Sequence, residues 1–144
     1  MSSKTMRFTG YALTGAFTLF MLFDVGIKLM RHPMVEETMR QLGFPGGLGF
    51  SIGVIEAICL VLYLVPRTAV LGAVLLMGVF GGGIATHLRH ADPLFSHVLF
   101  GVYLGLFMWG GLWLRSPDLR SVFPVRRVRC DRALALANRS SGPV

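Results

Sequence analysis

The chain has 144 residues, which is the length of a single domain. Hydrophobic residues make up 53% of it and charged residues only 15%, whereas a soluble domain carries roughly a quarter charged residues. This composition, with a mean hydropathy of +0.64, excludes an ordinary soluble domain and indicates a membrane protein. The net charge of +7 would suit nucleic acid, but the sequence shows no basic-aromatic surface module, so membrane lipid is the expected partner.

The first expected membrane span runs from about residue 11 to residue 30. Its length fits the ~20 mostly apolar residues that cross a bilayer, and only Asp24 and Lys28 interrupt it. Lys4 and Arg7 ahead of the apolar run imitate a signal peptide, but no clear small-residue cleavage site follows. We therefore expect a retained first helix.

A short amphipathic helix is predicted after the first span. Pro33 suits the first turn of a helix, Gly43 is placed to end it, and Pro45 cannot continue it. Its apolar residues recur at helical spacing, namely Met34, Val35, Met39 and Leu42. The segment is too short to span, so we expect it to lie at the membrane interface.

Three further apolar segments are expected to span the membrane, at about 47–65, 68–88 and 97–114. Pro66-Arg67 leaves only a tight turn between the first two, so these must be antiparallel neighbours. Each segment carries glycines four residues apart, which let a neighbouring helix approach closely. The pairs are Gly49 and Gly53, Gly78 and Gly82, and Gly101 and Gly105. The expected fold class is all-α: an integral membrane four-helix bundle with a short interfacial helix between spans one and two.

The bundle is expected to occupy residues 1–115, and residues 116–144 to form a basic, partly disordered tail. Orientation follows from the positive charges outside the spans. With both termini in the cytoplasm, ten lysines and arginines lie inside and three outside. The positive-inside rule therefore favours an orientation in the cytoplasmic (inner) membrane with both termini in the cytoplasm.

Ionisable residues lie in the outer halves of the spans, while the inner halves are almost wholly apolar. Glu56 is ~13 Å from the start of its span at 1.5 Å per residue, near mid-membrane. Asp24 and Lys28 are four residues apart and can pair on one helix face. One interpretation is an outward-opening polar pocket that also includes His87 and His97. The other is a charge network that only fixes helix packing.

A metal site is a further alternative, built from Glu56, His87, His90 and His97. These residues do not follow a recognised ligand spacing, so no metal is predicted.

Several motifs together resemble the DoxX-like family of small bacterial membrane proteins. They are Gly26-Ile-Lys28-Leu29, Leu42-Gly43-Phe-Pro45, Ile52-Gly53-x-x-Glu56, Pro66-Arg67-Thr68-Ala69 and Gly81-Gly82-Gly83-Ile-Ala-Thr86-His87-Leu-Arg89. The resemblance runs from about residue 8 to residue 124 and implies a four-helix membrane bundle. Some relatives are small subunits of quinone-linked oxidoreductases, and the family implies no agreed catalytic residue. The arginine-rich segment after Pro124 departs from the family pattern.

The leading functional hypothesis is a component of a membrane oxidoreductase system that binds a quinone or another lipophilic small molecule in the pocket. Glu56 and His87 are the candidate catalytic residues. The candidate substrate-binding residues are Asp24, Lys28, Thr86, Arg89 and His97. The sequence identifies no cofactor, so electrons would come from a redox partner protein. A cofactor-free acid–base membrane enzyme, a non-catalytic scaffold or assembly protein and a small transporter remain open alternative functions. For the partner, a homo-oligomer remains the alternative to a redox protein.

The orientation can be tested by cysteine labelling in intact cells. Glu37→Cys and Ser96→Cys should react with an impermeant thiol reagent, because both positions are expected outside. Ser140→Cys should not react, because the tail is expected in the cytoplasm. The reverse labelling pattern would overturn the orientation and move the pocket to the other leaflet.

Overall fold

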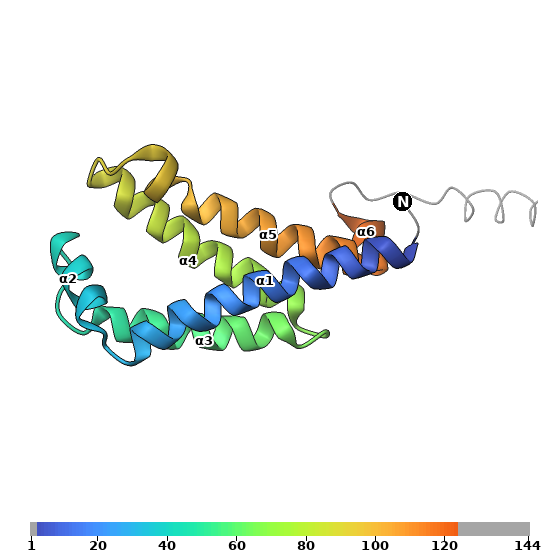
Figure 1. Cartoon of the computed structure of the whole chain (residues 1–144), viewed down its shortest axis with the longest axis horizontal. Coiled ribbons are helices and arrows are strands. Elements are labelled where there is room, and N and C mark those ends of the chain that lie inside the picture. The colour runs from blue at the N-terminus through green and yellow to red at the C-terminus, as the bar shows by residue number, and fades with distance from the viewer. Residues whose placement is uncertain (1–2, 124–144) are drawn as a thin grey trace, which may run out of the picture.

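The computed structural model describes residues 3–123 (Figure 1), and over this range the chain is all-helical, as predicted. The elements are α1 (Ser3–Leu29), α2 (Pro33–Gln41), α3 (Leu48–Leu64), α4 (Ala69–Arg89), η1 (Leu94–Val98, a single π-helical turn), α5 (Phe100–Arg115) and α6 (Pro117–Val122). The predicted tail begins with α6, and its remainder, residues 124–144, lies outside the described residues.

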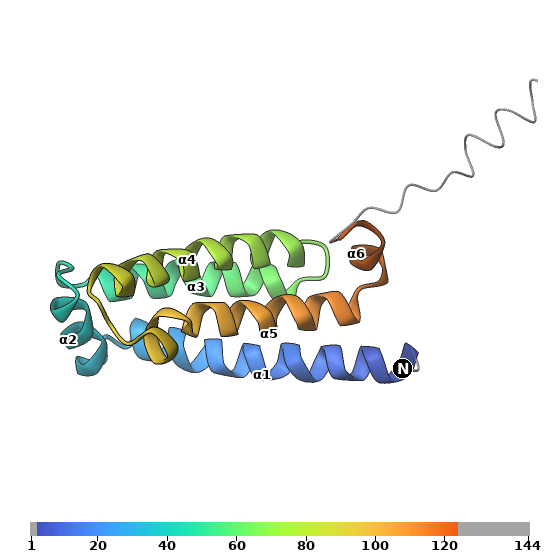
Figure 2. The same ribbon diagram turned by 90° about the horizontal axis from the view of Figure 1, so that it is seen from above.

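The four long helices α1, α3, α4 and α5 lie side by side (Figures 1 and 2). Helix α1 packs against α5 and α3, and α4 packs against α3 and α5, so the contacts close a ring. Helices α3 and α4 are antiparallel neighbours across the turn at Pro66-Arg67, which confirms that prediction.

Length and apolarity mark three helical segments as able to cross a membrane: residues 4–29, 69–89 and 94–115. Helix α3 is also apolar but has only 17 residues. The observed bounds lie close to the predicted spans, except that α1 begins eight residues earlier than expected, at Ser3. The structure therefore supports a membrane protein with transmembrane helices.

One end of the bundle is closed by a hydrogen-bonded aromatic residue. Tyr63 is fully buried, and its hydroxyl donates to the Met108 carbonyl oxygen at 3.1 Å and lies 3.4 Å from the Thr14 hydroxyl. Phe17 meets the Tyr63 ring edge-on at 5.4 Å between centroids. A buried tyrosine needs such partners for its hydroxyl, and here they join α3 to α5 and α1.

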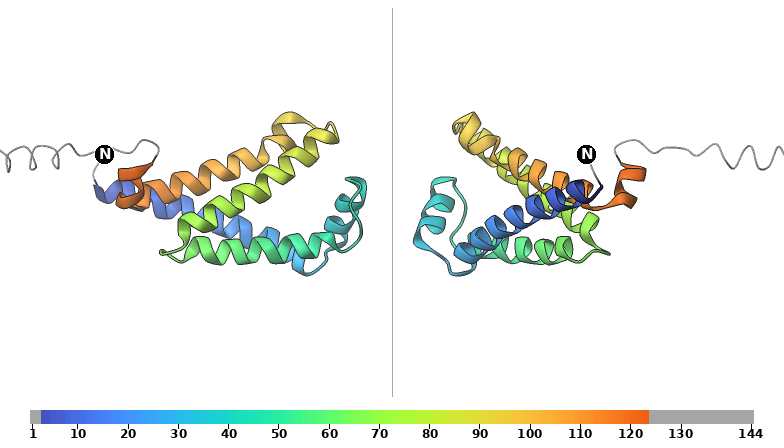
Figure 3. Two further views of the ribbon diagram at one scale, coloured as in Figure 1. Left: turned by 180° about the vertical axis from the view of Figure 1, so that it is seen from behind. Right: turned by 45° about the vertical axis from the view of Figure 1, so that its right-hand side comes forward.

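The opposite end is open. From the closed end, the α4–α5 pair diverges from the α1–α3 pair (Figure 3), and α2 lies across the wide end. Helix α2 forms as predicted: Pro33 occupies its first turn, and the His32 Nδ1 atom accepts from the Met34 N–H at 3.3 Å. A Glu36 carboxylate oxygen accepts from the Gly47 N–H at 3.1 Å, which fastens α2 to the start of α3.

The glycine pairs behave differently along the ring. A Cβ at Gly53 would lie 2.8 Å from the Lys28 Cβ, and one at Gly105 2.9 Å from the Met77 sulfur, so these glycines permit close approach as predicted. The same prediction is wrong for Gly78 and Gly82, which are exposed with no atom within 4 Å of an added Cβ. Gly82 lines the space that opens where α4 diverges from the α1–α3 pair, whereas Gly78 is exposed outside this space.

The close approach of α3 to α4 predicts different stabilities for two glycine variants of α4. Gly72→Ala places a Cβ against the Tyr63 backbone, only 2.6 Å from its Cα, and should lower stability by about 1–3 kcal/mol. Gly78→Ala on the same helix meets open space, so the higher helix propensity of alanine should leave the thermal midpoint in detergent unchanged or slightly raised. Equal midpoints for the two variants would contradict the observed packing of α3 on α4.

Candidate functional site

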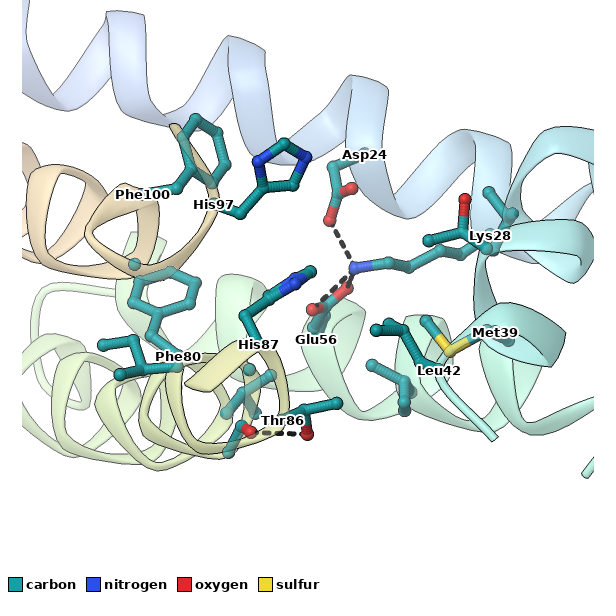
Figure 4. Close-up of a pocket in the computed structure, with 18 of the residues that line it drawn as sticks. Asp24, Lys28, Met39, Leu42, Glu56, Phe80, Thr86, His87, His97 and Phe100 are labelled. Atoms are coloured by element: carbon teal, nitrogen blue, oxygen red, sulfur yellow. Dashed lines mark hydrogen bonds and ion pairs between the residues drawn. The ribbon is translucent and has the colours of Figure 1, made fainter. Parts of the chain in front are cut away.

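A cavity of about 590 Å³ fills the open end of the bundle (Figure 4). Residues from α1, α2, α3, α4, η1 and α5 line it, and most of its wall is apolar. The residues that form this apolar wall include Phe20, Val35, Met39, Leu42, Phe80 and Phe100. The polar residues in the lining are Asp24, Lys28, Thr38, Glu56, Thr86, His87 and His97. The structure therefore brings six of the seven sequence-predicted site residues to one cavity.

An ion cluster forms the most buried polar part of this lining. The Lys28 Nζ atom lies 2.6 Å from Asp24 Oδ2 and 2.8 and 2.7 Å from the two Glu56 oxygens. The Glu56 side chain is only 5% exposed and that of Lys28 14%. The i,i+4 pair on α1 was expected from the sequence, and Lys28 supplies the partner that Glu56 lacks on its own helix.

The local sequence explains why these three groups meet. Gly53 lies one turn before Glu56 on α3 and has no side chain to keep α1 away. The Lys28 stem therefore lies directly on the α3 backbone, and its ammonium extends to the Glu56 carboxylate. Close backbone approach and the buried ion pair are thus two parts of one helix contact.

A second polar group lies where α4 ends. His87 Nδ1 is 2.6 Å from Asp92 Oδ2, and His90 Nδ1 is 3.2 Å from Asp92 Oδ1. The turn that returns Asp92 to His87 passes through Ala91, whose φ is +59°, and the Asp92 N–H donates to the His87 carbonyl oxygen. Because Asp92 accepts at Nδ1, the other ring nitrogen of His87, Nε2, is left for a different partner.

The hydrogen bonds from His87 and His90 lower the pKa of the Asp92 carboxyl below its ordinary value. A lowered pKa in the folded protein means that the ionised carboxylate stabilises this turn at neutral pH. The stabilisation is lost as the pH falls through the lowered pKa, where Asp92 takes up a proton.

The remaining predicted site residues have distinct positions. Thr86 donates its hydroxyl to the Gly82 carbonyl oxygen at 2.9 Å, so its proton is used within α4. His97 is exposed, with its ring 5.6 Å from that of His87. Arg89 does not line the cavity; it is exposed and its guanidinium points toward Gly43, in the connection between α2 and α3. A binding role for Arg89 stays a prediction.

Sequence reasoning missed two features of the cavity. One is Asp92, which lies outside the cavity lining but bonds the His87 ring within it; its place five residues after His87, across a helix end, was visible in the sequence. The covering role of α2 was also missed, although Val35, Met39 and Leu42 share one helical face. Within residues 3–123, no group of three or more His, Cys, Asp or Glu side chains is arranged to hold a metal ion.

A ring of apolar helices around a cavity with buried charges defines a helical membrane protein with a ligand-sized pocket. The chain belongs to the DoxX-like family, whose model matches residues 12–111. All the cavity-lining residues lie inside this matched range. No curated protein and no solved structure matches the chain.

The ion cluster predicts a strong effect of removing its only cation. Lys28→Met leaves the Asp24 and Glu56 carboxyl pair without its counter-charge and should destabilise the protein by about 3–5 kcal/mol. Adding Glu56→Gln should recover part of the loss, because one carboxylate is then neutral. Arg40→Met breaks the exposed ion pair with Glu37 and should leave the thermal midpoint unchanged. A silent Lys28→Met would show that the cluster does not hold α1 to α3.

Proposed function

We propose that the chain is an inner-membrane protein with four spans, both termini in the cytoplasm and the cavity near the outer surface. The charge count supports this orientation. Lys4, Arg7, Arg67 and Arg115 lie at the closed end, whereas the three positive residues counted as outside lie at the open end, with α2 and the turn after α4. In this orientation α2 lies at the level of the outer lipid headgroups, where an amphipathic helix is stable.

The protein's function in this proposal is to bind a lipophilic small molecule of the quinone class as a component of a membrane oxidoreductase system. The observation that carries the proposal is the combination of apolar walls and buried polar groups in one cavity of about 590 Å³. Small-molecule sites are of this size and are mostly apolar, with a few convergent polar groups that orient the ligand.

The lining suits the parts of a quinone. Phe80 and Phe100 supply aromatic surface for the ring, and the open end offers room for an apolar chain. Reduction of a quinone consumes two electrons and two protons. Glu56 and His87 are the groups proposed to handle protons, and a redox partner protein would supply the electrons.

A cofactor-free acid–base enzyme is the second candidate, and the His87–Asp92 pair favours it. A carboxylate at 2.6 Å from Nδ1 holds an imidazole in one orientation and tautomer, which leaves Nε2 as a proton acceptor. Such an enzyme would turn over a lipophilic substrate without any electron donor, whereas the quinone proposal requires one.

Binding can be tested with a matched pair of cavity-filling variants. Gly83 lines the cavity and Gly81 does not, yet both are exposed on α4 with open space around them. Gly83→Phe should weaken binding of a short-chain ubiquinone analogue to the purified protein at least tenfold, while Gly81→Phe should bind like the parent. Absence of quinone binding by the parent protein, with no lipophilic molecule extracted from it by mass spectrometry, would refute the proposal.

A further inference from the structure

We infer that Asp24 and Glu56 together hold one proton, and that this carboxyl hydrogen recognises an uncharged ligand through its carbonyl oxygen. The inference rests on the proposed binding function and specifies the ligand class: a neutral lipophile with a hydrogen-bond acceptor, rather than a lipophilic cation or a fatty-acid anion.

The charges around the cluster do not balance. Helix α1 contributes Asp24 and Lys28, and α3 contributes Glu56, so two carboxylates face one ammonium. The α2 and α5 residues in the lining are not titratable. On the other elements and nearby, the remaining titratable groups are His87 with Asp92 and His90, the exposed His97, Glu36 bonded to the Gly47 N–H, and the buried Cys59 thiol.

None of these outer groups can serve as the missing cation for the cluster. The His87 Nδ1 atom is bonded to Asp92, which carries a negative charge of its own, and His97 is exposed. An excess negative charge in an apolar membrane cavity is costly, and such groups neutralise themselves by binding a proton. One proton on the carboxyl pair brings the cluster to zero net charge.

The hydrogen bonds of Lys28 decide what the cavity can offer a ligand. An ammonium has three donors, and three carboxylate oxygens already surround Lys28 Nζ at 2.6–2.8 Å. Lys28 therefore has no donor left for a ligand. Among the described residues, the cluster oxygen that Lys28 leaves free is Asp24 Oδ1, on a side chain that is 26% exposed. The shared proton on this oxygen is the donor that the cluster presents to the cavity.

This arrangement selects among lipophilic ligands. A carbonyl oxygen accepts from the protonated carboxyl, as a quinone oxygen would. A fatty-acid anion would add a negative charge beside a carboxyl pair, and loss of the shared proton would add a second. Binding of such an anion is therefore disfavoured. A lipophilic cation would instead replace the proton, so its binding would strengthen as the pH rises, opposite to that of a neutral acceptor.

The experiment measures binding of a short-chain ubiquinone analogue to the purified full-length protein from pH 5 to pH 9. For the parent protein, Kd should stay constant at low pH and then rise up to tenfold per pH unit once the shared proton is lost. Asp24→Asn and Glu56→Gln each replace a carboxyl by a neutral amide of the same shape and should bind with a Kd that does not change with pH. Glu37→Gln, an exposed carboxyl outside the cavity lining, should keep the parent profile.

Infrared spectroscopy of the same proteins detects the proton without any ligand. The parent protein and Glu37→Gln should show the C=O band of a protonated carboxylic acid at neutral pH, and Asp24→Asn and Glu56→Gln should both lack it.

Absence of this band in the parent, or a Kd that does not change with pH, overturns the inference and leaves the proposed quinone site standing. The band without quinone binding refutes the proposed function and the ligand class, while the shared proton stands. Tighter binding of tetraphenylphosphonium as the pH rises, in place of the quinone analogue, would show that the cavity is a cation site.

Discussion

The contact of Lys28 with Glu56 is the interaction on which the open end of the bundle depends. A glutamate near the middle of an apolar helix is stable only if the fold brings it a partner, and that partner comes from a different helix at 2.7 Å. This requirement fixes the rotation of α1 and the register of α1 against α3. It also places Gly53 where the two backbones come closest. The polar part of the cavity is therefore a direct result of how α1 packs on α3.

The two ends of the bundle differ in how tightly they are packed and in which polar groups they contain. At the closed end, the Tyr63 hydroxyl is satisfied by Met108 and Thr14, and the described hydrophobic core contains no carboxylate, lysine, arginine or histidine. At the open end, the α4–α5 pair leaves the α1–α3 pair, and side chains with unused hydrogen-bonding capacity line the space between them. The cavity therefore lies between helices that are already formed, with α2 across its wide end.

Much of this arrangement was predictable because it depends on local sequence. The length of the apolar segments predicted the long helices, and Pro33 and Gly43 predicted the bounds of α2. The i,i+4 spacing predicted the Asp24–Lys28 pair. The Lys28–Glu56 contact and the Asp92–His87 contact depend on how segments meet in space, and spacing along the chain left several partners open. Gly82 shows the limit most clearly: its row matched a packing motif, but the helix it would have approached diverges from α4. The roles of the site residues remain predictions for the same reason.

The brevity of α3 has a consequence for the surrounding lipid. Its 17 residues span ~25 Å, which is less than the ~30 Å of an average hydrocarbon core. Its neighbours α1 and α4 are longer, so the mismatch falls on one side of the ring. If α3 spans the membrane, as proposed, the bilayer thins beside α3 or α2 makes up the difference, because Glu36 fastens α2 to Gly47 at the start of α3. In that arrangement, the length of the lipid acyl chains acts on α2, the helix that covers the cavity.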